Sequence, residues 1–207
     1  MRRVLTVAVA LLLAVGGCGG DDETETTDTT EESSTTSTTA DGATSTSSST
    51  PDGIDPMEDA GTDPVRSEGD GEGTSLLTDV RVARHEGFDR VVFEFDGPVP
   101  GFDVEYVEPP ITADGSGNEV EVEGDAFLQV RMEPASGFDL SGEGEQTYDG
   151  PTRLSGEDAG TSVIQEVVRT GDFEAVLAWV VGISDKVDFR VDTLEDPTRI
   201  VVDVRNH

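Results

Sequence analysis

The sequence predicts an all-β fold, an antiparallel β-sandwich of about nine strands, in the C-terminal part of the chain. Three observations support this fold class. Apolar and polar residues alternate with a period of two in several short runs from Leu76 onward, which is typical of half-buried strands. Clusters of Gly, Pro and Asp separate these runs, as turns do in a sandwich. No aromatic residue precedes Phe88, so we expect the core to form beyond that point.

The first element is an export signal over residues 1–17. Two arginines precede residues 4–15, an apolar run of 12 residues whose only polar member is Thr6. A helix of that length spans about 18 Å, short of the roughly 30 Å of a bilayer's hydrocarbon core. The run therefore predicts a signal peptide rather than a membrane-spanning helix.

Cys18 follows directly in Val15-Gly16-Gly17-Cys18, a run that resembles the bacterial lipobox. In that motif small residues admit the signal peptidase, and the cysteine thiol receives a diacylglycerol. The alternative is an incidental thiol, and because Cys18 is the only cysteine an intrachain disulfide is excluded. We expect a lipid, palmitate included, on Cys18, which would hold the protein at the extracytoplasmic face of the cell membrane.

Residues 18–74 predict a disordered, acidic linker. Between residues 24 and 50, 19 of 27 residues are Ser or Thr, and Pro51, Pro56 and Pro64 continue the polar segment. Such a composition buries too little apolar surface to offset the conformational entropy lost on folding. As a coil, the segment would span roughly 40 Å and hold the domain away from the membrane.

The domain over residues 75–207 begins with five predicted strands, at 79–83, 91–95, 104–106, 119–123 and 128–132. In the second strand Val91, Phe93 and Phe95 share one face, and in the last Leu128, Val130 and Met132 do. In the fourth strand the three glutamates, Glu119, Glu121 and Glu123, alternate with valines and predict a solvent-facing side.

The second half begins with an excursion over residues 136–160 that is rich in Gly and acidic residues. Residues 163–169 suit either a helix face or a strand, and their β-branched content favours a hairpin into 173–181 through Thr170-Gly171-Asp172. Residues 173–181 are apolar on both faces, which indicates a central strand. Strands at 186–194 and 199–204 complete the domain, the latter with Ile200, Val202 and Val204 inward.

Charge excludes two classes of partner. The chain carries 45 acidic and 13 basic residues, with 29 acidic and 10 basic residues in 75–207. Nucleic-acid binding requires a basic surface that displaces counterions from phosphates, so we expect no nucleic-acid partner. Electrostatic docking on an anionic bilayer is excluded for the same reason.

Several segments resemble the AMIN-like domain of exported actinobacterial lipoproteins. They are LLTDVRVARHEGFDRVVFEFDG, GFDVEYVEPP, TYDGPTRL, VVRTGDFEAVLAWVVG and FRVDTLEDPTRIVVDV, and together they span about residues 76–206. The strands that begin at Arg90 and Arg199 are more distantly similar to the AMIN domain of cell-wall amidases. The resemblance implies a sandwich of two β-sheets and attachment to peptidoglycan rather than catalysis.

Four residues are candidates for ligand binding. Arg90, Arg153 and Arg199 could meet carboxylates, and Tyr148, in a polar loop, could be exposed and stack on a sugar. The alternatives are that the arginines relieve the acidic surface and that Tyr148 fixes its loop. For Trp179 we expect a place in the core.

Residues for catalysis or metal binding are scarce. The only histidines are His85, expected in a surface loop, and His207, and no cysteine lies in the domain. A zinc site therefore lacks ligands. Asp114, Ser116 and Asn118 have the spacing of calcium ligands, but Glu119 stands where that loop requires Gly, so a turn is favoured.

We therefore expect a lipid-anchored, non-catalytic envelope module without metal or cofactor, which binds peptidoglycan or an envelope partner. The alternative is an extracytoplasmic hydrolase that uses a carboxylate pair or bound Ca²⁺.

Overall fold

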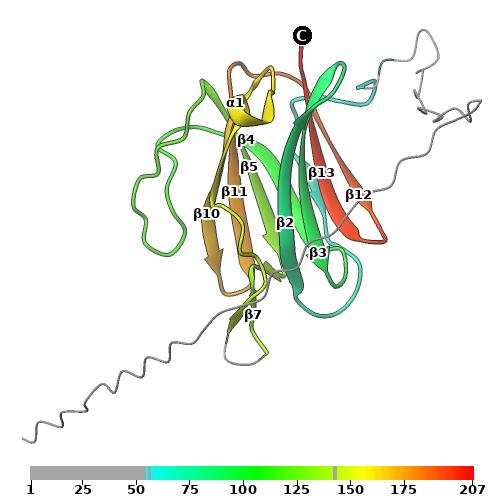
Figure 1. Ribbon diagram of the computed structural model, residues 1–207, viewed down its shortest axis with the longest axis vertical. Helices are drawn as coiled ribbons and strands as arrows, with labels where there is room; N and C mark the ends of the chain where they lie inside the picture. Colours follow the sequence, from blue (N-terminus) through cyan, green and yellow to red (C-terminus); the bar gives the residue numbers. More distant parts are fainter. Residues whose placement is uncertain (1–54, 56, 142–143) are drawn as a thin grey trace, which may run out of the picture. The chain divides into compact units, whose positions relative to one another are not determined.

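The computed structural model describes residue 55 and residues 57–141 and 144–207. The fold is all-β, as predicted, with two larger sheets and a small hairpin (Figure 1). The predicted signal peptide, Cys18 and the linker up to residue 54 lie outside the described residues.

The first sheet, sheet A, has five strands in the order β12-β13-β3-β2-β6. Its pairs are antiparallel except for β2 and β6, which are parallel. The bounds are β2 (Ser75–Arg84), β3 (Phe88–Asp96), β6 (Ala135–Ser136), β12 (Phe189–Leu194) and β13 (Thr198–Arg205).

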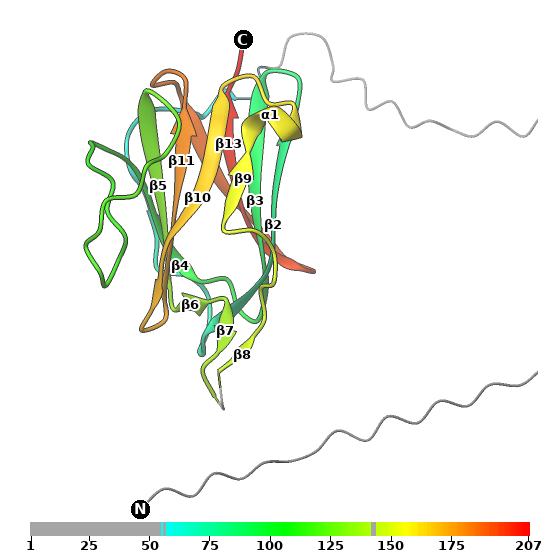
Figure 2. The ribbon, with the colours of Figure 1, turned by 60° about the vertical axis from the view of Figure 1, so that its left-hand side comes forward.

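The second sheet, sheet B, has six antiparallel strands in the order β1-β4-β5-β11-β10-β9. The bounds are β1 (Val65–Ser67), β4 (Gly101–Val107), β5 (Ala126–Glu133), β9 (Arg153–Ser155), β10 (Ile164–Phe173) and β11 (Val176–Ile183). Figure 2 shows the two sheets face to face, with the short strands β7 (Phe138–Asp139) and β8 (Glu145–Gln146) at one end.

The core lies between the inner faces of the two sheets. All residues that were predicted to face inward are buried in three of the predicted strands, 91–95, 128–132 and 199–204. Trp179 of β11 is fully buried, as expected, with its ring centroid 5.8 Å from that of Phe93 and 5.9 Å from that of Tyr148. The alternation visible in the sequence therefore marks the core correctly on both sheets.

The predicted hairpin into β11 is confirmed, but the position of its turn is corrected. Residues 170–172 belong to β10, which pairs with β11 up to Phe173 and Val176. The turn is Glu174-Ala175, and both residues have positive φ, 52° and 60°. As predicted, β11 is central, because it pairs with β10 on one side and β5 on the other.

A loop over residues 108–125 replaces the strand predicted at 119–123. Its only ladder contact among the described residues is an isolated bridge between Thr112 and Glu119. The loop lies against the outer face of sheet B: a Cβ on Gly182 would meet the Glu123 carbonyl oxygen at 1.9 Å. This cover explains why β11 is apolar on its outer face too, where Ala178 and Val180 are fully buried.

The excursion predicted over residues 136–160 contains only short elements, among them β7, β8, β9 and the single-turn helix α1 (Gly156–Ala159). Its Ser155 caps the helix by accepting a hydrogen bond from the Asp158 N–H. The described residues of this region therefore form short ordered elements, as expected, and no long strand.

The ordered domain begins before residue 75, which corrects the predicted end of the linker. Residues 57–67, here called the strap, run along the side of the sandwich between β12 and β4. Met57 is fully buried, Gly61 exchanges two backbone hydrogen bonds with Phe189 (3.1 and 2.8 Å), and β1 pairs with β4. The apolar residues of the strap are too widely spaced to stand out in a polar sequence.

The strap is also fixed at its start, by charged groups at the end of β13. Arg205 donates to the Met57 carbonyl oxygen at 2.9 Å and to the Asp55 carboxylate at 3.1 Å. Asp55 accepts a hydrogen bond from the Met57 N–H, and this bond, helped by Arg205, lowers the pKa of Asp55.

Asp89 of β3 ties the two sheets together. Its Oδ2 accepts hydrogen bonds from three consecutive backbone N–H groups, those of Ser162 and Val163 just before β10 and of Ile164, the first residue of β10, at 2.8, 2.7 and 3.2 Å. Its Oδ1 accepts from the Asn206 amide at 2.8 Å. This fully buried carboxylate is thus satisfied entirely within the chain.

Candidate functional site

The outer face of sheet A gathers basic residues in a strongly acidic domain. Outward-facing positions of adjacent strands place Arg190, Asp203 and Arg90 side by side, one from each of β12, β13 and β3. Arg81 of β2 lies opposite Val92, and Arg199 of β13 lies opposite Glu94. The arginines of the salt bridges on this face keep 28–48% of their side-chain surface exposed, so the face reaches solvent.

Asp203 is the centre of the first group on this face. Its side chain is 1% exposed and accepts two hydrogen bonds from Arg90, at 2.6 and 2.9 Å, and one from Arg190 at 2.8 Å. The hydrogen bonds to Asp203 raise the pKa of Arg90. Arg90 also lies over the Phe88 ring, 5.0 Å from its centroid. Arg90 is therefore engaged on two sides.

Arg81 forms a second group with two carboxylates. It donates to Glu94 at 2.7 Å and to Asp79 at 2.6 Å. The hydrogen bond to Glu94 is the largest cause of the raised pKa of Arg81. These pairs are solvent-exposed, and each contributes at most about 1 kcal/mol to stability.

Arg199 stands apart from the other arginines of the face. Its Nε donates to the Pro197 carbonyl oxygen at 3.1 Å. Within the described part of the chain no carboxylate oxygen lies within 4.0 Å of its guanidinium. Among the described residues of this face, the positive charge of Arg199 is thus the one that a carboxylate ligand could meet without displacing a carboxylate partner.

The four candidates from the sequence do not form one site. Arg90 and Arg199 share the outer face of sheet A, although they lie four residues apart along the ladder. Arg153 belongs to β9 of sheet B, where it pairs with Glu166 and donates to the Glu121 carbonyl oxygen at 3.0 Å. That contact fixes the loop over residues 108–125, which indicates a structural role.

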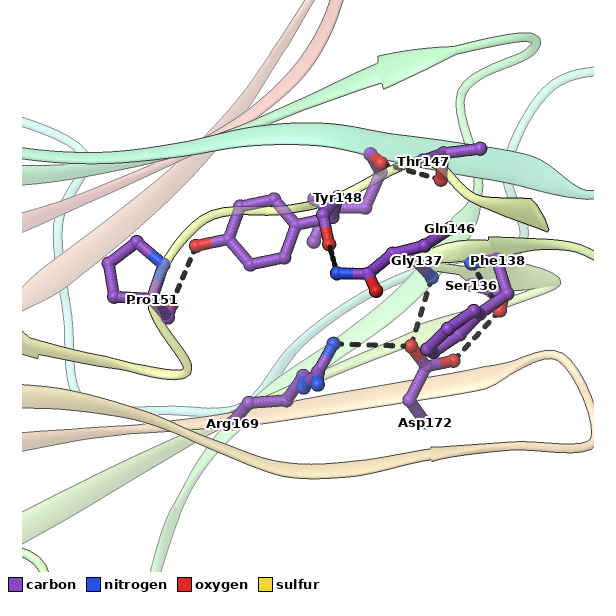
Figure 3. Close-up of polar contacts among 10 residues, drawn as sticks. Ser136, Gly137, Phe138, Gln146, Thr147, Tyr148, Pro151, Arg169 and Asp172 are labelled. Carbon is purple, nitrogen blue, oxygen red and sulfur yellow. Dashed lines mark hydrogen bonds and ion pairs between the residues drawn. The ribbon is translucent and has the colours of Figure 1, made fainter. Parts of the chain in front are cut away.

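Tyr148 is not an exposed aromatic residue, which corrects that expectation. It is 1% exposed and packs edge-on against Trp179. Its hydroxyl donates to the Pro151 carbonyl oxygen at 2.7 Å (Figure 3). Burial raises the pKa of Tyr148. Tyr148 therefore fixes its loop, the alternative left open by the sequence.

Asp172 organises the chain beside Tyr148 (Figure 3). Its carboxylate accepts hydrogen bonds from the Ser136 hydroxyl at 2.8 Å and the Gly137 N–H at 3.0 Å, and Arg169 lies 3.5 Å away. All these partners belong to the chain itself, so the network holds the β7–β8 hairpin against the end of β10.

The residues considered for catalysis and calcium are exposed. Glu119, Glu121 and Glu123 face solvent, as predicted, and so does His85, which stacks on Phe88 with 4.9 Å between ring centroids. Asp114 and Ser116 form a turn closed by the Asn118 carbonyl and the Ala113 N–H at 2.8 Å. Across the described ranges no group of three or more His, Cys, Asp or Glu is placed to hold a metal ion.

Sequence reasoning missed three members of the arginine-bearing face, Arg81, Arg190 and Asp203. Their signal was present: each occupies an outward position next to an inward apolar residue in a strand that the sequence marks clearly. Pairing between strands brings them together, and the order of strands in the sheet cannot be read from the alternation alone.

Comparisons with known proteins give one match. The family model described as the AMIN-like domain matches residues 75–206, which is more than half of the chain. No curated protein and no solved structure matches. Among the described residues no helix is long and apolar enough to cross a membrane.

Proposed function

The chain belongs to the AMIN-like domain family, and on that premise we propose that it is a non-catalytic attachment module of the cell envelope. Its ligand would be peptidoglycan or an envelope partner, and a lipid on Cys18 would hold it at the outer face of the membrane. The alternative is a hydrolase with a carboxylate pair or Ca²⁺, and in the described residues no group of three or more His, Cys, Asp or Glu is placed to hold that ion.

One observation carries the proposal: the solvent-facing outer face of sheet A, with Arg199 free of a carboxylate partner among the described residues. A guanidinium presents its donors in a planar fork that matches a carboxylate. The stem peptides of a cell wall carry carboxylates, so Arg199 supplies a local contact. Arg90 and Arg81 lie on the same face but are held by Asp203 and Glu94.

Pelleting of the full chain with insoluble peptidoglycan tests this surface. Arg199→Ala should reduce the pelleted fraction severalfold, because a charge-assisted contact contributes about 1.5–3 kcal/mol. Arg84→Ala is the matched control: Arg84 also lacks a carboxylate partner within the described residues but lies at the end of β2, away from this face. Equal pelleting of both variants and the parent chain would exclude the face, and release of soluble muropeptides would contradict a non-catalytic module.

We expect pelleting to increase with salt concentration, whereas binding by attraction between opposite charges would decrease. Residues 75–207 carry 29 acidic and 10 basic residues, so the domain and an anionic wall repel each other at long range. Raising the ionic strength from about 0.01 to 0.15 M shortens the Debye length from about 30 to 8 Å. Pelleting should therefore increase over this range while the short contact at Arg199 persists. A steady decrease would indicate attraction between opposite charges instead.

The anchor is tested separately by metabolic labelling with palmitate. The parent chain should incorporate the label and fractionate with membranes, and Cys18→Ala should do neither, because no other cysteine can accept the lipid. Equal labelling of the two chains would refute lipidation at Cys18 without bearing on wall binding.

A further inference from the structure

Strand β12 has an open edge beyond its contact with the strap. In an antiparallel strand the N–H and C=O groups of one residue point to the same neighbour, and successive residues alternate between neighbours. Phe189 directs both groups to Gly61, whereas Asp188 accepts a hydrogen bond from the Arg205 N–H of β13. By this alternation the backbone groups of Val191 and Thr193 point away from β13. No other described strand pairs with them.

The strap leaves β12 at this point and opens a groove. After Gly61 the chain passes Pro64 and joins β4 of sheet B through β1. Between the departing strap and β12 lies a hollow of about 390 Å³, lined by strap residues and by residues 189–192. We call this hollow the edge groove. In Figure 1, β12 lies at the outer side of sheet A, beyond β13.

The length of β12 distinguishes it from other outermost strands. The outermost strands β1, β6 and β9 have two or three residues each, whereas β12 has six. A short edge offers too few backbone groups to hold a second chain. The free part of β12, from Val191 to Leu194, is long enough to pair with a short extended peptide.

The charge around the edge groove defines its occupant. Asp59, Asp63 and Asp192 line the groove, and Glu195 and Asp196 follow β12 directly. The one cation of the lining, Arg190, already donates to Asp203 at 2.8 Å and lies 3.2 Å from Asp192. The remaining charge is negative, so it favours a peptide that carries Lys or Arg.

Two other occupants are disfavoured by the same charge. Residues 19–54 carry nine carboxylates and no Lys or Arg, so this part of the chain would be repelled. A second copy would bring an equally acidic edge. We propose that the open edge of β12 binds an extended, Lys- or Arg-bearing peptide segment of an envelope partner by strand addition, a mode in which backbone hydrogen bonds supply affinity and flanking side chains supply selectivity.

The test measures binding of a fluorescein-labelled peptide of alternating Lys and Val to the full chain by fluorescence polarisation. A peptide of alternating Glu and Val is the charge control. Thr193→Pro removes the N–H that points to the open edge and leaves the β12–β13 hydrogen bonds intact, because proline is tolerated where an edge N–H faces solvent. Thr193→Ala is the matched control, since Thr193 is exposed and its backbone is then unchanged.

We expect the Lys-Val peptide to bind and Thr193→Pro to weaken binding at least about tenfold, a loss of about 1.4 kcal/mol, while Thr193→Ala binds like the parent chain. Amide exchange at Val191 and Thr193 should slow when the peptide is bound. Unchanged thermal unfolding of Thr193→Pro would confirm that the loss is local.

Three results would overturn the proposal. They are equal binding of the Glu-Val peptide, equal binding by Thr193→Pro and Thr193→Ala, and a peptide-free dimer that Thr193→Pro dissociates. The first removes charge selection, the second removes strand addition, and the third makes a second copy the occupant. The inference stands apart from wall binding: Thr193→Pro should still pellet with peptidoglycan, and Arg199→Ala should still bind the peptide.

Discussion

At the scale of the residue, Asp203 explains why so many charges can share one side of sheet A. Buried carboxylates are costly unless they are paired and fully hydrogen-bonded. Asp203 meets this condition with three hydrogen bonds from two arginines. Each arginine stays partly exposed, so it keeps contact with water while it neutralises the carboxylate.

Asp203→Ala should lower the free energy of unfolding by about 3 kcal/mol, because it removes charged hydrogen bonds and leaves two guanidinium groups without their shared partner. Arg90→Ala and Arg190→Ala should each cost less, since the other arginine still neutralises Asp203. Urea unfolding of the three variants measures the order of these losses of stability. A larger loss in either arginine variant would show that Asp203 depends on one partner alone.

The two tyrosines predict a loss of stability at alkaline pH. Burial is the first cause of the raised pKa of both Tyr106 and Tyr148, the only tyrosines of the chain. A raised pKa means that the folded state favours the neutral phenol. The stability from this preference is complete below the usual tyrosine pKa of about 10 and is lost as the pH rises through the folded values.

Tyrosinate absorbance, followed against pH together with circular dichroism, measures this effect. Both tyrosines should ionise at a pH above the usual tyrosine pKa. The later of the two to ionise should do so only as the fold is lost. Ionisation of both at the ordinary pKa with the fold intact would contradict their burial.

Tyr148 also shows what a local sequence cannot reveal. Its neighbours are polar and glycine-rich, which is the composition of an exposed loop. The ring is nevertheless buried, because the chain passes over Trp179 and gives the hydroxyl a partner at Pro151, three residues away. Contacts made across the fold, here with a strand 31 positions later, decide its burial.

At the scale of the element, the turn between β10 and β11 is formed by residues that do not favour its backbone conformation. A two-residue hairpin loop with positive φ at both positions is the type I′ geometry, which prefers Asn-Gly. Here Glu174 and Ala175 adopt it. The long ladder between β10 and β11 imposes the turn, since eight residue pairs between the two strands fix their register.

Replacing Glu174-Ala175 by Asn-Gly should raise the free energy of unfolding by about 1–2 kcal/mol, because it relieves left-handed strain at two positions. Thermal unfolding measures the gain. Ala83→Gly, in the exposed interior of β2, is the control and should destabilise by about 0.5–1 kcal/mol. A loss of stability in the Asn-Gly chain would mean that the Glu174 or Ala175 side chain contributes more than the strain costs.

The elements that the sequence predicted well are those whose inward residues alternate along a paired strand. Residues 119–123 alternate in the same way and still form no strand. Their valines, Val120 and Val122, are half-buried while the glutamates face solvent. A segment that lies across a sheet and one that pairs within it both separate apolar from polar sides, so periodicity alone does not distinguish the two arrangements.

At the scale of the whole molecule, the domain is larger than the family match suggests. The match begins at residue 75, but the strap lies against β12 and β4, and it fills a core position with Met57. The fold class and most strands could be predicted from sequence. The strap could not, because separate contacts of different kinds hold it and none of them leaves a periodic pattern.

A chain that begins at residue 75 should therefore unfold more easily than one that begins at residue 49, by about 3–5 kcal/mol. Loss of a buried methionine side chain alone costs about 2–5 kcal/mol, and the pairing of Gly61 and of β1 is lost with it. Urea unfolding of the two chains and of the full chain tests this. Equal midpoints for all three would show that the strap adds nothing to the fold.

The position of the strap also determines how the domain responds to a pulling force. Arg205 holds the chain at Asp55 and Met57, so tension applied from the amino-terminal side reaches this clamp first. The next resistance comes from the buried Met57 side chain and then from the bridge between Gly61 and Phe189, followed by the three residue pairs of β1 and β4. Under tension the strap would detach one contact after another and lengthen the connection, while sheet A and the other five strands of sheet B stay folded. In such a domain the strap lengthens under a pulling force before the sandwich itself unfolds.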